Sequence, residues 1–150
     1  MNAWTVKLPT EADTARLGEA VAAALRPGEA VCLSGPLGAG KSTLARALVR
    51  ALTTPDEEVP SPTFTLVQFY EAPRLNIAHF DLYRLTSADE AYEIGLDEAL
   101  EDGAAVIEWP ERLDGRLPPQ RLDIEITLEG EGRAARLTPH GAWKGRSLGF

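Results

Sequence analysis

The sequence predicts an α/β fold built on a mixed β-sheet, and three features of the chain lead to that prediction. A short apolar run, a glycine-rich loop and an amphipathic segment follow one another over residues 29–52, as in a strand–loop–helix unit. Two strand-like runs, 64–71 and 75–82, are separated only by Ala72-Pro73-Arg74, which indicates an antiparallel hairpin. A second alternating pair occupies residues 122–137. Because hairpins and a strand–loop–helix unit coexist, we expect parallel and antiparallel strands in one sheet.

The composition is that of an ordinary globular protein. The 150 residues are 44% hydrophobic and 25% charged, so we expect one domain, residues 1–150, that is large enough to bury a core. No apolar run is long enough to span a membrane, and the N-terminal residues lack the features of a signal peptide, so we expect a cytoplasmic protein without membrane contact. The single cysteine, Cys32, rules out an intramolecular disulfide. The net charge of −8 disfavours direct binding to nucleic acid.

The N-terminal part of the chain has the pattern of a strand followed by a helix. Residues 4–8 alternate as in a strand. Thr10-Glu11-Ala12-Asp13 resembles a helix capping box with Asp in place of Glu. Apolar residues recur at helical spacing over 17–25, and Pro27-Gly28 ends the helix.

The next unit contains the clearest functional motif. Residues 35–42 read Gly-Pro-Leu-Gly-Ala-Gly-Lys-Ser, the G-x-x-x-x-G-K-S pattern of the phosphate-binding loop of P-loop NTPases. The run 29–34 before it indicates a buried strand, and apolar residues over 44–52 recur at helical spacing, so the motif has the context that it requires. The expected fold is therefore P-loop NTPase-like, with three layers, a mixed central sheet and a C-terminal β-hairpin.

Each fixed residue of this loop has a chemical role. The glycines let backbone N–H groups surround phosphate oxygens, Lys41 brings a positive charge to the β- and γ-phosphates, and Ser42 supplies a hydroxyl for Mg²⁺. The helix that the loop opens adds the positive end of its dipole. The residues expected to bind the nucleotide are Gly35, Leu37, Gly38, Ala39, Gly40, Lys41, Ser42 and Thr43.

The remainder of the chain continues the mixed pattern. A polar loop with three prolines covers 53–63, and the hairpin strands follow it. Residues 87–103 form an acidic helical stretch that Gly95 interrupts, and 104–107 indicates another buried strand. Apolar and polar residues alternate over 122–128, and the turn Glu129-Gly130-Glu131-Gly132 leads to a partner strand that runs through Leu137.

Two acidic residues stand at the ends of predicted strands. A P-loop needs such a residue to hold Mg²⁺, directly or through water. Asp81 has the short side chain that suits a rigid octahedral shell, and Glu108 has the reach to orient or deprotonate an attacking water. We therefore assign Asp81 to Mg²⁺ and Glu108 to water activation, and the predicted metal set is Ser42, Asp81 and Glu108. The alternative for either residue is a strand-end cap or an ion pair.

Two further residues belong to the predicted catalytic set, which is Glu108, Lys41, Trp109 and Thr63. Thr63 follows the polar loop, so it is a candidate sensor of the γ-phosphate or its Mg²⁺; the alternative is an ordinary Ser-Pro turn. Trp109 directly follows Glu108 and is either a buried anchor or a contact for nucleotide or partner. His79 is one of only two histidines and no matching cysteines exist, so we expect no zinc site.

Taken together, four motifs resemble the TsaE family, also called YjeE. They are the loop at 35–42, Ser-Pro-Thr-Phe at 61–64 with Tyr70, His-Phe-Asp-Leu-Tyr-Arg-Leu at 79–85, and Ile-Glu-Trp-Pro-Glu at 107–111. The resemblance runs from the first helix to Glu111. Position 42 is serine where threonine is common in the family, and either hydroxyl can bind Mg²⁺.

This resemblance implies a bacterial ATPase that hydrolyses ATP with Mg²⁺ and assists the threonylcarbamoyl modification of tRNA adenosine 37. It implies that the protein docks on a complex of TsaB with the transferase TsaD and reaches tRNA only indirectly. By resemblance, Lys41 and Ser42 lie at the phosphates and Mg²⁺, Asp81 lies at Mg²⁺, and Glu108 and Trp109 act in hydrolysis.

Two other functions remain open on the sequence. A small-molecule kinase usually inserts a lid that carries arginine, and the loop 53–63 is short and has none. A nucleotide-sensing module would bind ATP without hydrolysing it, and phosphate release without an acceptor distinguishes the two classes. The acidic stretch 86–131 and the basic tail 132–150 are either solvated faces or partner surfaces.

Overall fold

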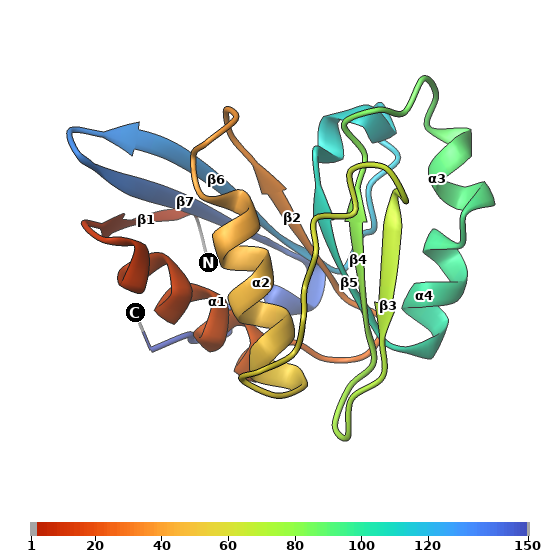
Figure 1. The fold of residues 1–150 in the computed structure, drawn as a ribbon, viewed down its shortest axis with the longest axis horizontal. Helices are drawn as coiled ribbons and strands as arrows, with labels where there is room; N and C mark the ends of the chain where they lie inside the picture. The colour runs from red at the N-terminus through yellow and green to blue at the C-terminus, as the bar shows by residue number, and fades with distance from the viewer. Residues whose placement is uncertain (1–2, 150) are drawn as a thin grey trace.

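The computed structural model describes residues 3–149 and places a seven-stranded sheet between two layers of helices (Figure 1). In chain order the elements are β1 (Trp4–Leu8), α1 (Glu11–Ala24), β2 (Ala30–Ser34), α2 (Lys41–Leu52), β3 (Val67–Tyr70), β4 (Ile77–Asp81), α3 (Asp89–Glu93), α4 (Leu96–Asp102), β5 (Ala104–Glu108), the 3₁₀ turn η1 (Pro110–Leu113), β6 (Arg121–Glu129), β7 (Gly132–His140) and the 3₁₀ turn η2 (Gly141–Trp143). Most elements lie where the hydrophobic pattern predicts them.

The sheet is mixed, as predicted, and its strand order is β1-β7-β6-β2-β5-β4-β3. The central strands β6, β2, β5 and β4 run parallel, and antiparallel pairs flank them on both sides. Leu33 and Asp81 both stand opposite Glu108 in the register. The carboxyl ends of β2, β5 and β4 therefore meet at one edge of the sheet, where ligands bind in open α/β folds.

Alternation along β2 explains why helices cover both faces of the sheet. Val31 and Leu33 point into one core, together with buried residues of α1 and α2, whereas Ala30 and Cys32 point into a second core with residues of α4. Figure 1 shows α1 and α2 packed together over one part of the sheet, and on the other face α4 contacts β5. Burial raises the pKa of the Cys32 thiol, so this residue is a small core hydrophobe.

The start of α1 confirms the capping box. The Asp13 N–H donates to Thr10 Oγ1 at 3.3 Å, and the Thr10 N–H donates to Asp13 Oδ2 at 2.9 Å. Among residues 3–149, the structure has no helix with both the length and the apolar character needed to cross a membrane.

The hairpin strand β3 begins at Val67, and the prediction of a strand from Phe64 was wrong. The Leu66 N–H donates to the Pro62 carbonyl at 2.6 Å, and Leu66 has a φ of 70°, so residues 62–66 turn before the strand starts. The turn leaves Phe64 82% exposed. At the other end of the chain, β7 continues past Leu137 to His140.

The basic tail is partly built into the fold. Arg146 donates to both oxygens of Glu29, at 2.7 and 2.8 Å, and both side chains are buried. Its guanidinium also stacks 4.4 Å from the ring centre of Trp143. Arg146 is therefore neither solvated nor free to meet a partner, in contrast to the expectation for this tail.

Candidate active site

The glycine-rich loop joins β2 to α2 and leaves the start of that helix open to a ligand. Gly40 precedes α2 with a φ of 107° and makes no side-chain cap, and the first turn of the helix carries no acidic residue. The first intrahelical bond runs from the Leu44 N–H to the Gly40 carbonyl at 3.0 Å. The N–H groups at the start of α2 therefore remain free of intrahelical partners and can bind an anion.

Two strands from the C-terminal half hold the loop in shape. A Cβ at Gly35 would collide with the carbonyl oxygen of Ile126 on β6, and its φ of 137° also favours glycine. On β7, Arg133 donates from Nε to the Ala39 carbonyl at 3.0 Å and from Nη2 to the Gly38 carbonyl at 3.1 Å. These bonds occupy the carbonyl oxygens at the tip of the loop.

Lys41 is buried, and its charged Nζ contacts neutral groups. Its Nζ donates to the carbonyl of Gly35, approaches that of Pro36 at 3.5 Å and lies 3.8 Å from the ring centre of Trp109. Within residues 3–149 it forms no salt bridge. Burial lowers the pKa of Lys41, and the more distant Glu108 acts in the opposite direction.

Both predicted carboxylates reach the same edge of the sheet, beside the loop. Glu108 places Oε1 3.4 Å from Ser42 Oγ, and its Oε2 lies 2.6 Å from Nε2 of His79. Asp81 accepts a bond from Thr63 Oγ1 at 3.1 Å on Oδ2 and one from the Tyr83 N–H at 3.0 Å on Oδ1. The carboxylate closest to the Ser42 hydroxyl is thus Glu108, and Asp81 anchors Thr63.

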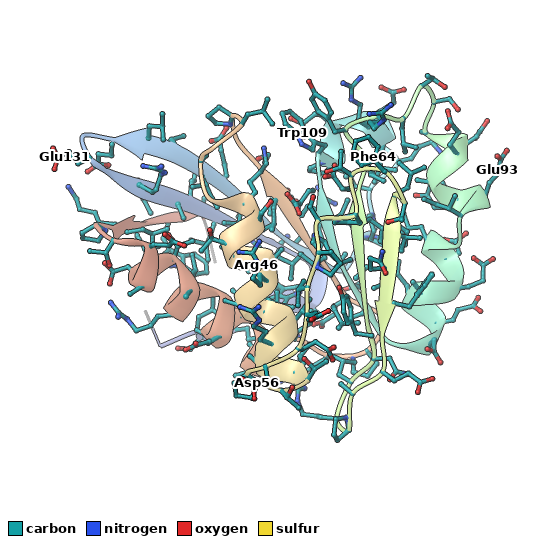
Figure 2. All side chains as sticks on the ribbon, in the orientation of Figure 1. Arg46, Asp56, Phe64, Glu93, Trp109 and Glu131 are labelled. Carbon is teal, nitrogen blue, oxygen red and sulfur yellow. The ribbon has the colours of Figure 1, made fainter. Side chains whose placement is uncertain are left out.

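Trp109 is held in an unusual backbone conformation at the rim of the site. Its φ of 60° lies in the left-handed region, which a bulky residue rarely adopts. Its ring packs 4.9 Å from that of Tyr83. Figure 2 shows Trp109 and Phe64 at the same upper end of the molecule, near the tops of β5 and β4. The backbone strain, together with the cation above the ring, makes Trp109 part of the site.

These residues enclose one cavity of about 270 Å³. Its lining consists of Leu37, Gly38, Gly40, Lys41, Ser42, Thr43, Ser61, Thr63, Asp81, Glu108 and Trp109. All predicted catalytic and metal residues are in this set. Of the predicted nucleotide-binding residues, Gly35 and Ala39 are outside it: Gly35 accepts from Lys41, and Ala39 is buried in the core.

A second cavity, of about 380 Å³, lies on the other side of the loop. It shares Gly38, Gly40 and Thr43 with the first. The start of α1 and the β6–β7 turn complete its lining with Leu8, Pro9, Thr10, Glu11, Thr14, Glu131, Gly132 and Arg133. The loop therefore separates two adjoining hollows.

Comparison with known proteins establishes the family. Residues 8–136 match the family model described as threonylcarbamoyl adenosine biosynthesis protein TsaE. The chain belongs to the TsaE family. The resemblance predicted from the four motifs is thereby confirmed.

Similar proteins cover most of this TsaE chain. It is 38% identical over 128 residues to the tRNA threonylcarbamoyladenosine biosynthesis protein TsaE of Rickettsia bellii, which spans 85% of this chain and 88% of that protein. It is 43% identical over 108 residues to the protein of the same name from Aquifex aeolicus, covering 71% and 77% of the two chains. The crystal structure of Bacillus subtilis YdiB superposes with a TM-score of 0.78 at 26% identity and covers 95% of this chain and 89% of that one.

The donor set of this TsaE site suits Mg²⁺ bound together with a phosphate. Among residues 3–149 there is no group of three His, Cys, Asp or Glu side chains that would hold a metal alone. Ser42 and Glu108 converge at 3.4 Å, with Asp81 opposite Glu108 in the register. Magnesium in P-loop sites uses few protein ligands and completes its octahedron with phosphate oxygens and water, so the residues fit.

Sequence reasoning missed three contributors to the site. The sequence places His79 on the same strand face as Asp81, but its contact with Glu108 was not predicted because it depends on the pairing of β4 with β5. Arg133 and the Thr10–Glu11 segment come from parts of the chain that no local motif ties to the loop. Their role depends on strand pairing far along the sequence.

Proposed function

We propose that this TsaE chain binds ATP with Mg²⁺ at residues 35–43 and hydrolyses it, in support of threonylcarbamoylation of tRNA adenosine 37 by a TsaB–TsaD complex. One observation carries the proposal: a single cavity combines the open start of α2, the cation of Lys41, which has no carboxylate partner within residues 3–149, the Ser42 hydroxyl and two buried carboxylates. Each is a group that phosphoryl transfer needs.

The charge balance of the cavity supports a triphosphate as its ligand. Lys41 rests on neutral carbonyls and an aromatic ring, so a phosphate oxygen offers it a stronger, charge-assisted partner. The N–H groups at the start of α2 add the positive end of the helix dipole. Arg133 holds the outward carbonyls of Gly38 and Ala39 and thereby keeps the loop open for the ligand.

The geometry favours Ser42 and Glu108 as the side chains nearest to Mg²⁺. Both Asp81 oxygens already accept hydrogen bonds from Thr63 and Tyr83, whereas the one hydrogen bond that Glu108 Oε1 accepts from a described residue is that of the Ser42 hydroxyl. Bound there, Mg²⁺ would polarise the phosphates and neutralise developing charge. In this arrangement Glu108 acts at the metal and its water, and Asp81 acts as the outer carboxylate that sets Thr63.

The second cavity fits the nucleoside end of the ligand. It adjoins the phosphate cavity through Gly38, Gly40 and Thr43, so a molecule bound in both would straddle the loop. Thr10, Glu11 and Thr14 supply hydrogen-bonding side chains there. A nucleoside triphosphate has the matching form, with an anionic chain and a polar ring system at opposite ends.

An exposed apolar rim beside the site supports a protein partner that closes it. Phe64 is 82% and Leu37 71% exposed, and Tyr83 is 41% exposed. Arg84 lies 4.9 Å from the Phe64 ring centre, which adds a cation to the rim. Exposed apolar side chains at the edge of a cavity are typical of an interaction surface, and closure of this rim would exclude water from the phosphates.

Phosphate release tests the proposal. It would be measured for the chain alone, with TsaD, with TsaB, with both, and after addition of tRNA. We expect slow phosphate release from the chain alone and faster release with both partners, because a partner protein that closes such a site completes it.

Phe64→Ser should lower the stimulation by the partners, and Leu128→Ser, at an exposed position on β6, is the matched control. Equal rates in all mixtures, with no co-migration on gel filtration in ATP, would refute the partner role. Tight ATP binding without any release would favour a nucleotide sensor.

A further inference from the structure

A histidine stands directly behind the carboxylate of Glu108. His79 on β4 is 2% exposed, and its Nε2 lies 2.6 Å from Oε2 of Glu108 on the neighbouring strand β5. Glu108 is itself 3% exposed. The other oxygen of the same carboxylate faces Ser42 Oγ at 3.4 Å. One carboxylate is thus held between an imidazole on one side and the loop hydroxyl on the other.

The surroundings of the ring select one tautomer. Two bare acceptors would repel each other at 2.6 Å, so a proton lies between Nε2 and Oε2. His79 Nδ1 is buried and has no hydrogen-bond partner within residues 3–149. A proton on Nδ1 would leave an unsatisfied donor in the core, which is the more costly defect. The arrangement that satisfies the atoms is an Nε2–H that donates to an ionised Glu108.

We infer that His79 is a positioning residue for Glu108: its Nε2–H fixes the carboxylate so that Oε1 points at the Ser42 hydroxyl and the metal side of the cavity. A glutamate has several rotatable bonds, and fixing its head group in advance removes that ordering from the reaction. Imidazole–carboxylate contacts of this kind orient ligands at metal sites in general. The catalytic consequence rests on the proposed function, while the positioning itself is a property of the fold.

The chain offers its own control. His140 on β7 lies with Nε2 2.9 Å from Asp123 Oδ2 on β6, and both side chains are about one-third exposed. That pair has the same chemistry, yet Asp123 also receives Arg121 Nε at 3.0 Å and lies outside the lining of both loop cavities. Removing His140 tests what the loss of any histidine–carboxylate contact does to the protein.

The first experiment compares His79→Leu, His79→Gln and His140→Leu by single-turnover phosphate release with TsaB and TsaD present. We expect His79→Leu to slow release about 10–100-fold with a nearly unchanged nucleotide dissociation constant, as for other partners of metal-site ligands. His79→Gln should retain most of the rate because its amide N–H replaces the Nε2–H, and His140→Leu should be normal. In a Glu108→Gln background, His79→Leu should cause no further loss. An equal loss in both backgrounds would overturn the inference.

Two measurements decide the positioning without any hydrolysis. A crystal structure of His79→Leu should show Glu108 turned away from Ser42, and an unchanged carboxylate would overturn the inference. Imidazole ¹⁵N NMR of the native chain should show His79 protonated at Nε2 and bare at Nδ1, and a proton on Nδ1 would also overturn it. If the native protein with its partners releases no phosphate, the proposed function fails, whereas these two readouts still test the role of His79.

Discussion

The two ends of β2 both carry buried charge, but they balance it differently. At the amino end, Glu29 and Arg146 meet through two short hydrogen bonds, and Arg146 also donates to the Ala24 carbonyl at 3.0 Å. At the carboxyl end, the cation of Lys41 meets carbonyls and a ring, and Glu108 meets a hydroxyl and an imidazole. Charges are paired at the first end and kept apart at the second.

This difference separates a structural role from a functional one. A buried ion pair that satisfies itself has no need of a ligand, and its removal on one side leaves an uncompensated charge in the core. Buried charges of opposite sign that line one cavity without pairing can instead bind a ligand that enters the cavity. The comparison predicts that mutations at the two ends will affect different measurements.

Glu108→Gln should give the largest effect, and the effect should appear in hydrolysis. We expect single-turnover phosphate release to fall about 10²–10⁴-fold, because under the proposed function the neutral amide loses the charge that acts at Mg²⁺ and its water. The thermal midpoint of unfolding should change little, since Gln keeps an oxygen for His79.

Asp81→Asn should slow phosphate release less than Glu108→Gln does, because Asp81 acts by holding Thr63. Magnesium titrations of nucleotide binding on both variants check this division. A larger shift of the magnesium midpoint in Asp81→Asn would reverse it.

Arg146→Met should affect stability and leave the nucleotide site unchanged. Without the guanidinium, the buried carboxylate of Glu29 has lost its charged partner. Removing one partner of a buried ion pair typically lowers the free energy of unfolding by about 3–5 kcal/mol. Urea unfolding measures the loss, and nucleotide titration at low temperature should match the native chain. The double variant with Glu29→Leu should recover much of the stability. If Arg146→Met is just as destabilising in the Glu29→Leu background, the ion pair is not the cause.

The same comparison explains what the sequence can and cannot predict. The loop, Lys41 and Ser42 are local signals, and Asp81 and Glu108 are found because buried strands end at them. Parallel strands bring those ends together, so the main residues of the cavity follow from local patterns. Arg133, His79 and Arg146 contribute through contacts that depend on strand pairing and tail packing. A prediction for the tail based on composition therefore missed that the Arg146 side chain is buried against Glu29.

Lys41→Ala should weaken nucleotide binding and leave stability intact, whereas Arg146→Met should lower stability and leave nucleotide binding intact. We expect triphosphate affinity to fall about 10–150-fold, the equivalent of a charge-assisted contact of about 1.5–3 kcal/mol. Stability should hold or rise, because burial lowers the pKa of Lys41 and thus disfavours its charged form in the fold. Isothermal titration with ATP and urea unfolding make the comparison. An unchanged dissociation constant would show that the loop is not the triphosphate site.

Lys7→Ala should have the smallest effect, and it shows how little an exposed ion pair away from both ends of β2 contributes to stability. Lys7 lies on the edge strand β1 and meets Glu129 at 3.0 Å, with side chains that are 80% and 50% exposed. Water solvates both groups and salt screens them, so we expect the free energy of unfolding to change by less than about 0.5 kcal/mol. Any residual effect should vanish at 1 M salt. Urea unfolding at low and high salt, with ATP titration beside it, checks this. A loss of unfolding free energy as large as that of Arg146→Met would mean that burial does not determine how much a charged residue contributes to stability. The contrast between the two ends of β2 would then have no physical explanation.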